Sequence, residues 1–232
     1  IVAMWDRIGH MVAMTKNAYE IQTPKGRKRA QRQLDWADHG ILRYRWHNFT
    51  QLVPGVYRSN HPTTARFEAY AAMGIKTVFS LRGGKHMPQY LFEVETCEQL
   101  GLRLECFKMS AREAPTVERL NMLFDVFERI EPPFLMHCKS GADRTGLASA
   151  IYLLAYAGAD LAAAKAQLSF DFIHIRRTAT GILDHFLDTY EARFNETGIG
   201  VRDWIATEYD AEALTVSFAA KQRKLRFWQG WR

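Results

Sequence analysis

The sequence predicts an α/β fold with a central, mostly parallel sheet of four to five strands flanked by helices on both faces. Three observations indicate this fold. From residue 51 onward, short β-branched and apolar runs alternate with amphipathic stretches of helical period. Gly and Pro residues separate these runs. The 232 residues are 47% hydrophobic and 24% charged, which is the balance of a globular protein.

Four segments are expected to be strands. Residues 77–81 combine β-branched and aromatic side chains and end at a Gly-Gly pair. Residues 134–136 are apolar throughout, which is typical of a strand buried on both faces. The four predicted strands are residues 56–58, 77–81, 102–109 and 134–136.

Amphipathic stretches between and after these strands predict the helices. In the clearest of them, apolar residues recur every three or four positions from Val117 to Phe127. Pro132-Pro133 stops that helix before the next strand. The predicted helices are residues 62–73, 88–100, 116–130, 145–156, 159–168, 180–194 and 201–209.

The two ends of the chain differ in charge from its middle. Of the net charge of +6, residues 25–45 carry +5 and residues 221–232 carry another +5, so the rest is acidic. We therefore expect a helical basic extension at 1–50, beginning with a helix over 1–20, a main domain at 51–210 and a helical, basic aromatic tail at 211–232. Such ends can contact an anionic membrane surface, although solvated faces are the simpler interpretation. No nucleic acid partner is expected.

The cysteine content indicates a reducing compartment. Three cysteines without close spacing form neither a disulfide framework nor a zinc motif. No metal and no cofactor are expected. The longest apolar stretch, residues 147–164, is too short and interrupted to span a bilayer. The protein is expected in the cytoplasm, with membrane association left open. Because the chain begins at Ile1, a trimmed signal peptide also stays open.

One run of residues carries the chemistry. It is His137-Cys138-Lys139-Ser140-Gly141-Ala142-Asp143-Arg144-Thr145-Gly146, between the strand at 134–136 and the helix at 145–156. Gly141 allows the backbone of residues 138–144, here called the signature loop, to curl so that its N–H groups converge on one point. The following helix adds its positive N-terminus, and Arg144 supplies a planar fork of donors. These groups predict a phosphate pocket made by Lys139, Ser140, Gly141, Ala142, Asp143 and Arg144.

The same positive surroundings act on the thiol of Cys138. A free thiol has a pKa of about 8.5, and helix N-termini and cations lower it to about 3.5–7.5. Cys138 is therefore expected to be a thiolate that attacks phosphorus and forms a cysteinyl-phosphate, which water then hydrolyses. Thr145 can donate its hydroxyl to the sulfur, and His137 can hydrogen-bond loop carbonyls.

This run resembles the active-site signature of the protein tyrosine and dual-specificity phosphatase superfamily. Residues 134–158 are similar to its strand, loop and helix, and residues 56–59 and 78–82 are similar to early strands of small bacterial dual-specificity-like members. The resemblance implies a metal-free phosphomonoester hydrolase and covers roughly residues 50–190. It also implies that an upstream loop Asp protonates the leaving group.

The expected position of that acid, residues 108–115, holds no Asp. Glu113 is its only carboxylic acid. Asp143 within the signature loop is a second candidate, because an Asp at this position resembles myotubularin lipid phosphatases and certain broad-specificity bacterial phosphatases. We place Asp143 first and Glu113 second. The competing interpretations are a structural salt bridge for Asp143 and a solvated charge for Glu113.

The expected substrates are phosphorylated proteins or phospholipids. Lys139 adds a cation that suits strongly anionic substrates, so a phosphoinositide or other lipid phosphatase of the same mechanism is one alternative. A phosphate-binding module without catalysis is another. Arg58 and Arg82 are expected to support the site or face solvent. The segment with His174, Arg176 and Arg177 is expected to be a solvated loop, with a place at the substrate entrance as the alternative.

Overall fold

A computed structural model describes residues 19–229 and places a five-stranded sheet at the centre of the molecule. The strand order is β1-β2-β5-β3-β4, in which β1 runs antiparallel to β2 and the other neighbours are parallel. The strands are β1 (Thr50–Val53), β2 (Val56–Ser59), β3 (Thr77–Ser80), β4 (Arg103–Cys106) and β5 (Phe134–His137).

The register of the three central strands aligns their carboxyl ends. Ser59 of β2 and Ser80 of β3 both pair with His137, the last residue of β5. Because parallel strands end at the same edge, the residues that follow β2 and β3 lie on either side of the loop that follows β5. The signature loop therefore starts between two other chain segments.

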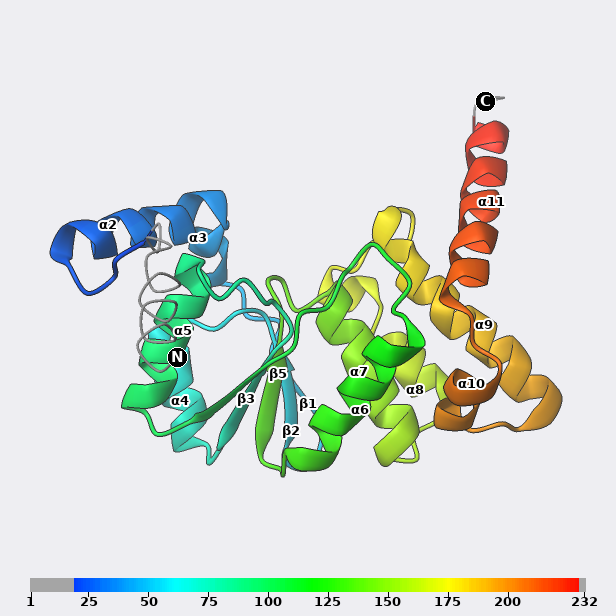
Figure 1. The fold of residues 1–232 in the computed structure, drawn as a ribbon, viewed down its shortest axis with the longest axis horizontal. Coiled ribbons are helices and arrows are strands. Elements are labelled where there is room, and N and C mark those ends of the chain that lie inside the picture. The colour runs from blue at the N-terminus through cyan, green and yellow to red at the C-terminus, as the bar shows by residue number, and fades with distance from the viewer. Residues whose placement is uncertain (1–18, 230–232) are drawn as a thin grey trace, which may run out of the picture.

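Helices cover both faces of the sheet, as Figure 1 shows. One face carries α4 (Thr64–Ala72) and α5 (Pro88–Gln99), and the other carries α6 (Val117–Arg129) and α7 (Asp143–Tyr156). Behind α7 lie α8 (Leu161–Ala166), α9 (Ile182–Thr197) and α10 (Val201–Thr207), with short 3-10 helices η2 (Phe170–Phe172) and η3 (Ala179–Gly181) between α8 and α9.

The largest apolar core lies between the sheet and the helices of the second face. Phe134 and Met136 of β5 are fully buried there with Leu147 of α7, Phe186 of α9 and other apolar side chains. A smaller cluster on the first face joins Phe67 to β3 and α5. Leu135 of β5 is buried in another small cluster with Tyr70 and Ile75. The strand that carries the signature loop is thus packed on both sides, which holds the loop's starting point in place.

Two further segments extend this arrangement (Figure 1). Before β1 lie α2 (Pro24–Arg32), the π-helix η1 (Gln33–Ala37) and α3 (Gly40–Arg43). Arg27 of α2 forms an ion pair of 2.6 Å with Glu95 of α5, which ties the segment to the first face of the sheet. After α10 lies α11 (Ala211–Gln229).

The predicted elements match observed ones to within three residues at each end, the largest relative difference being β4, which is Arg103–Cys106 instead of 102–109. The antiparallel edge strand β1 and the short helix α3 were not expected. Both begin close to residues with positive φ, His39 and Asn48, which the sequence pattern does not mark. The helix predicted over residues 1–20 falls almost wholly outside the described residues. No helix in the described part of the chain has the length and apolar character needed to cross a bilayer.

Candidate active site

The signature loop curls tightly around Gly141. This residue has a φ of +74°, and a Cβ atom there would lie 2.6 Å from the carbonyl oxygen of Ser59. Only glycine combines that backbone conformation with so close an approach to β2. The loop is pinned on both sides, because His61 N–H donates to the Lys139 carbonyl and Leu81 N–H donates to the His137 carbonyl.

Cys138 lies at the base of this curl and is 1% exposed. Burial by itself raises the pKa of its thiol. The charge of Arg144, the Thr145 hydroxyl and the N–H groups of Thr145 and Gly141 outweigh burial, so the pKa lies below its ordinary value. These groups stabilise the thiolate, the reactive form of cysteine.

The first turn of α7 faces the same point. The helix begins at Asp143, and no side chain caps its N-terminus, so the first N–H groups keep their capacity to bind an anion. Arg144 Nη1 lies 3.4 Å from the carbonyl oxygen of Leu81, at the end of β3. The guanidinium is therefore held beside the loop rather than directed away into solvent.

Arg58 of β2 supports the loop from behind. Its side chain is fully buried, stacks at 3.6 Å on the ring of Phe172, and donates hydrogen bonds to the carbonyl oxygen of Gly141 and to Gln167. Burial lowers the pKa of this guanidinium to about 9, with the Cys138 charge acting in the opposite sense. Arg58 is thus a second cation close to the thiolate. This position agrees with the supporting role expected from the sequence.

His137 points behind the loop. Its Nε2 lies 2.5 Å from Oε1 of the buried Glu93, and its Nδ1 lies 3.2 Å from the carbonyl oxygen of Cys138. Ser80 also donates to Glu93. Together with His61, these side chains bring three metal-ligating atoms within 4.8 Å of one another. Two of the three side chains, His137 and Glu93, are joined by a direct hydrogen bond.

Lys139 does not turn into the curl but toward the segment before β1. Its Nζ lies 3.2 Å from Nδ1 of His39 and 3.6 Å from Oδ1 of Asp38. The same Asp38 carboxylate accepts hydrogen bonds from Arg82, at 2.6 Å, and from Arg43, at 2.7 Å. The segment at 38–43, predicted as part of an extension, therefore contacts the signature loop.

Asn48 strengthens this contact between the segment and the loop. Its side-chain amide donates to the carbonyl oxygens of Ser140, at 3.1 Å, and Phe172, at 2.9 Å. Asn tolerates the positive φ of 51° that the backbone has here better than most residues do.

Asp143 is paired with a buried histidine. His174 is 3% exposed, and its two ring nitrogens each lie 2.7 Å from a carboxylate, Nδ1 from Asp143 and Nε2 from Asp184. Burial opposes protonation, but the two carboxylates raise the pKa of His174 to about 9. The expectation of a solvated loop is wrong for His174, because the segment after η2 folds inward against α9.

Glu113 occupies an exposed position on the loop between β4 and α6. The loop is anchored at its start, where Phe107 N–H donates to Ser80, and near its end, where Tyr209 donates to the carbonyl oxygen of Pro115 at 2.8 Å. Among the described residues, no hydrogen bond joins Glu113 to the signature loop. The loop nonetheless leaves the sheet at the edge where Cys138 lies.

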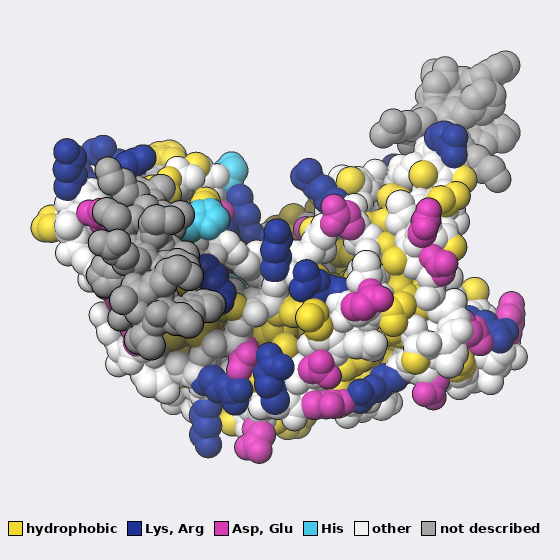
Figure 2. Space-filling view, viewed as in Figure 1, with side chains coloured by type: hydrophobic (Ala, Val, Ile, Leu, Met, Phe, Trp, Pro, Cys, Tyr) yellow, Lys and Arg dark blue, Asp and Glu magenta, His cyan; other side chains and the backbone are white. Residues whose placement is uncertain are grey.

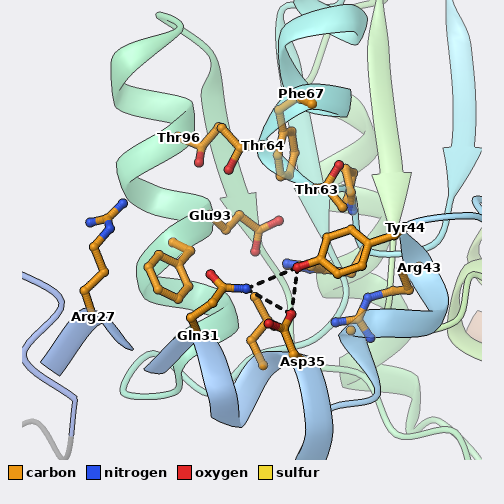
Figure 3. Close-up of a pocket in the computed structure, with 16 residues that line it drawn as sticks. Arg27, Gln31, Asp35, Arg43, Tyr44, Thr63, Thr64, Phe67, Glu93 and Thr96 are labelled. Carbon is orange, nitrogen blue, oxygen red and sulfur yellow. Dashed lines mark hydrogen bonds between the residues drawn. The ribbon is translucent and has the colours of Figure 1, made fainter. Parts of the chain in front are cut away.

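A separate cavity of about 330 Å³ lies next to the signature loop, between the segment before β1 and the helices α4 and α5. Figure 3 shows side chains from both walls pointing into it, among them Asp35, Tyr44, Phe67 and Glu93. In the view, Asp35 accepts hydrogen bonds from Tyr44 and Gln31. Cys138 does not line this cavity.

The structure thus brings Cys138, Gly141, Arg144 and Thr145 together and sends three other predicted residues elsewhere. Lys139 pairs with the segment at 38–43, His137 with Glu93, and Asp143 with His174. Sequence reasoning missed Asp38, Asn48 and Glu93. Asp38 stands out only as an acidic residue in a basic run and Glu93 only as an acidic residue on an amphipathic helix, while Asn48 carries no sequence signal, so none of the three indicates a particular contact.

A thiolate held by backbone N–H groups and an arginine, in a loop between the central parallel strand and a helix, defines the class of cysteine-dependent phosphatases. Residues 47–180 match the family described as Swiss Army Knife protein, DSP-PTPase phosphatase domain, and the chain belongs to this family. It is a cysteine-dependent phosphatase of the protein tyrosine and dual-specificity type.

Solved structures are similar to parts of the chain. The P. aeruginosa protein TpbA is 22% identical, with a TM-score of 0.50 over 75% of this chain and 91% of that one. A cysteine-to-serine variant of TpbA in complex with pTyr is 25% identical, with a TM-score of 0.47 and coverage of 63% and 96%. The core catalytic domain of the S. cerevisiae PP-IP phosphatase SIW14 is 21% identical, with a TM-score of 0.49 and coverage of 66% and 93%. No curated protein matches the chain significantly.

Proposed function

We propose that Cys138 is the nucleophile of this phosphatase. Its thiolate attacks the phosphorus of a phosphomonoester in line, forming a P–S bond while the P–O bond to the alcohol breaks. The observation that carries this proposal is the position of Cys138 at the base of a loop whose Gly141 and Thr145 N–H groups point at it beside Arg144, an arrangement that lowers the pKa of the thiol. Water then attacks the cysteinyl-phosphate and releases phosphate, which regenerates the thiolate.

Arg144 and the loop backbone bind the phosphoryl group in this proposal. The guanidinium offers two parallel donors to two phosphoryl oxygens, and the uncapped N-terminus of α7 offers N–H groups to the others. Because these donors are held in place by β5 and α7, little reorganisation is needed as charge develops on the transferring group. Lys139, Ser140, Gly141 and Ala142 supply the remaining loop contacts.

Thr145 assists the second step. Its hydroxyl is fully buried, has no other hydrogen-bond partner among the described residues, and lies close enough to the sulfur to help lower the pKa of Cys138. A hydrogen bond to the sulfur stabilises the thiolate as a leaving group when water attacks the intermediate. His137, by contrast, acts behind the loop and holds its first carbonyl group.

The proton for the leaving group is assigned to Glu113. The sequence alone favours Asp143, but the Asp143 carboxylate accepts a hydrogen bond from His174 within a buried cluster. That bond supports a positioning role for Asp143 at the start of α7. Glu113 has no such partner among the described residues and lies on the loop where the family usually carries its acid.

The substrate proposed first is a phosphorylated protein side chain. A phospholipid head group is the second candidate, favoured by the cations Arg82 and Lys139 beside the loop. Contact with an anionic membrane would use the basic side chains of α2, Lys25, Lys28, Arg29 and Arg32, which surround the exposed Trp36. Co-sedimentation with anionic and neutral vesicles tests that contact.

The domain boundaries and the cellular compartment are part of the same proposal. We place the phosphatase domain at 51–210, since α9 and α10 bury Phe186 and Trp204 in its main core. Residues 1–50 and 211–232 are then extensions. The three cysteines are free, which supports a reducing compartment such as the cytoplasm.

Hydrolysis of 4-nitrophenyl phosphate in the presence of a chelator tests the mechanism. Cys138→Ser is expected to abolish turnover, and rapid quenching of the wild type should trap a phosphate group on Cys138 for mass spectrometry. Cys97→Ser is the matched control, because burial raises the pKa of that thiol to about 12 and makes it unreactive. Full activity of Cys138→Ser would overturn the proposed mechanism.

A further inference from the structure

Three cations share a single carboxylate beside the signature loop. Asp38 forms ion pairs with Arg43, Arg82 and Lys139 at 2.7, 2.6 and 3.6 Å. Within this group, called here the cation group, two positive charges are left unbalanced. Keeping unbalanced charges out of water is unfavourable unless an anion accompanies them.

Burial makes this imbalance more significant. The side chains of Arg43 and Arg82 are only 5% and 7% exposed. Nη1 of Arg82 is buried and has no hydrogen-bond partner among the described residues. A buried donor without a partner is rare, since leaving it unsatisfied costs free energy that an acceptor would recover. Arg82 therefore has an unused capacity to bind an anionic oxygen.

The cation group lies next to the catalytic loop. Lys139 directly follows Cys138 in the chain, and Arg82 directly follows Leu81, whose carbonyl oxygen is contacted by Arg144. The side chain of Lys139 is 37% exposed, which opens the group to solvent. Figure 2 shows Lys and Arg side chains gathered around the hollow between the N-terminal side of the molecule and the side formed by the later helices.

We propose that Arg82, Lys139 and Arg43 form a second anion subsite, which binds another phosphate or carboxylate group of a substrate whose scissile phosphate occupies the signature loop. This inference rests on the proposed function and specifies its substrate class as one with two neighbouring anionic groups. A single phosphotyrosine would leave the subsite unused.

Asp38 is the internal anion of this subsite. It comes from the segment before β1 and follows directly on η1, so the extension itself supplies the carboxylate that the substrate's second anion would face. The two arginines hold the pKa of Asp38 below its ordinary value against the opposing effect of burial, so the carboxylate is ionised at neutral pH. Asp38 thus weakens the attraction of the subsite for anions without cancelling it.

Binding of inorganic phosphate and pyrophosphate to the Cys138→Ser protein tests the subsite without turnover. Isothermal titration calorimetry at 0.15 M salt should show pyrophosphate binding about tenfold or more tightly than phosphate, because its second phosphoryl group gains charge-assisted hydrogen bonds. Adding Asp38→Asn to the Cys138→Ser protein should increase this preference for pyrophosphate over phosphate. Adding Arg82→Gln instead should reduce the ratio of the two affinities toward one.

Asp35→Asn is the matched control, since it removes the same charge from the same segment at a carboxylate bonded to Tyr44 and Gln31 (Figure 3). Asp35 forms no ion pair with the cation group and acts on Arg43 only through the distance-dependent attraction of its charge, so the preference of Asp35→Asn for pyrophosphate should change much less than that of Asp38→Asn. Equal binding of the two anions by the parent, or a preference that Arg82→Gln leaves intact, would overturn the subsite. Absence of phosphate binding altogether would instead contradict the proposed function. Circular dichroism of each variant establishes that it is folded.

Discussion

Nδ1 of His174 lies 2.7 Å from Oδ1 of Asp143, the residue that starts α7 and directly precedes Arg144. The second ring nitrogen of His174 lies 2.7 Å from Asp184 on α9. With its pKa raised to about 9 by these carboxylates, the ring is protonated at neutral pH and donates to both. His174 therefore connects the signature loop to a helix of the core through two charged hydrogen bonds.

Stability should depend on pH through His174. Its pKa in the folded protein is above the unfolded value of 6.5, so the stabilisation is fully present below pH 6.5 and is lost as the pH rises through about 9. One pKa unit corresponds to about 1.4 kcal/mol, so the loss is on the order of 3 kcal/mol. Urea unfolding of wild type and His174→Gln between pH 6 and 10 measures it.

The free energies of unfolding of wild type and His174→Gln should differ most at the acidic end of this pH range and converge at the alkaline end. His185→Gln is the control, because burial lowers the pKa of His185 and it bonds Ser217 instead. If the difference in free energy of unfolding between wild type and His174→Gln stayed constant across the whole pH range, His174 would contribute only packing and no charged hydrogen bonds.

Arg144→Lys should reduce kcat/KM for an aryl phosphate about 100- to 1000-fold, the range seen when one preorganised transition-state donor is removed. Lysine keeps the charge but lacks the planar fork that matches two phosphoryl oxygens. Steady-state kinetics measures the effect, and Arg129→Lys on the last turn of α6 should change nothing. An activity within a few-fold of wild type would remove Arg144 from transition-state binding.

The fold and the centre of the site follow from sequence patterns that act over short range. The run from His137 to Gly146 predicts its own curl, because a glycine, a helix start and an arginine lie at fixed offsets within it. The partners of Asp143 and Lys139 could not be predicted, since His174 and Asp38 are 31 and 101 positions away. Only the tertiary fold brings such side chains together, and many acidic or basic residues could have served equally well.

Thr145→Val should raise the pKa of Cys138 and slow breakdown of the intermediate. The valine preserves the shape of the side chain but removes the hydroxyl that helps to lower this pKa. The pH dependence of inactivation by iodoacetate reports the thiol pKa, and it should move to higher pH. Stopped-flow kinetics should show a larger burst of 4-nitrophenol. Ser149→Ala, about one turn further along α7, removes a hydroxyl that donates to Met136 instead, and it is expected to leave both readouts unchanged.

Glu113→Gln should slow only substrates with poor leaving groups. Protonation limits the rate when the departing oxygen is strongly basic, and general acid catalysis then contributes about 100- to 10,000-fold. Comparing 4-nitrophenyl phosphate with an alkyl phosphate on Glu113→Gln and Asp143→Asn separates the two carboxylic acids. If Asp143→Asn alone shows the leaving-group dependence, the proton comes from Asp143 and the assignment made here is wrong.

Glu93→Ala should destabilise the fold and loosen the signature loop together. Glu93 is 2% exposed and accepts hydrogen bonds from Ser80 and His137, so its removal leaves buried polar groups on two central strands without partners. The expected loss is about 1–3 kcal/mol for each buried group left without a partner. Urea unfolding measures the loss, with Glu98→Ala on the exposed side of the same helix as control. His137 also contacts the Cys138 carbonyl group, so the pH dependence of inactivation by iodoacetate should change in the folded variant as well. If that pH dependence stayed the same, Glu93 would have a purely structural role.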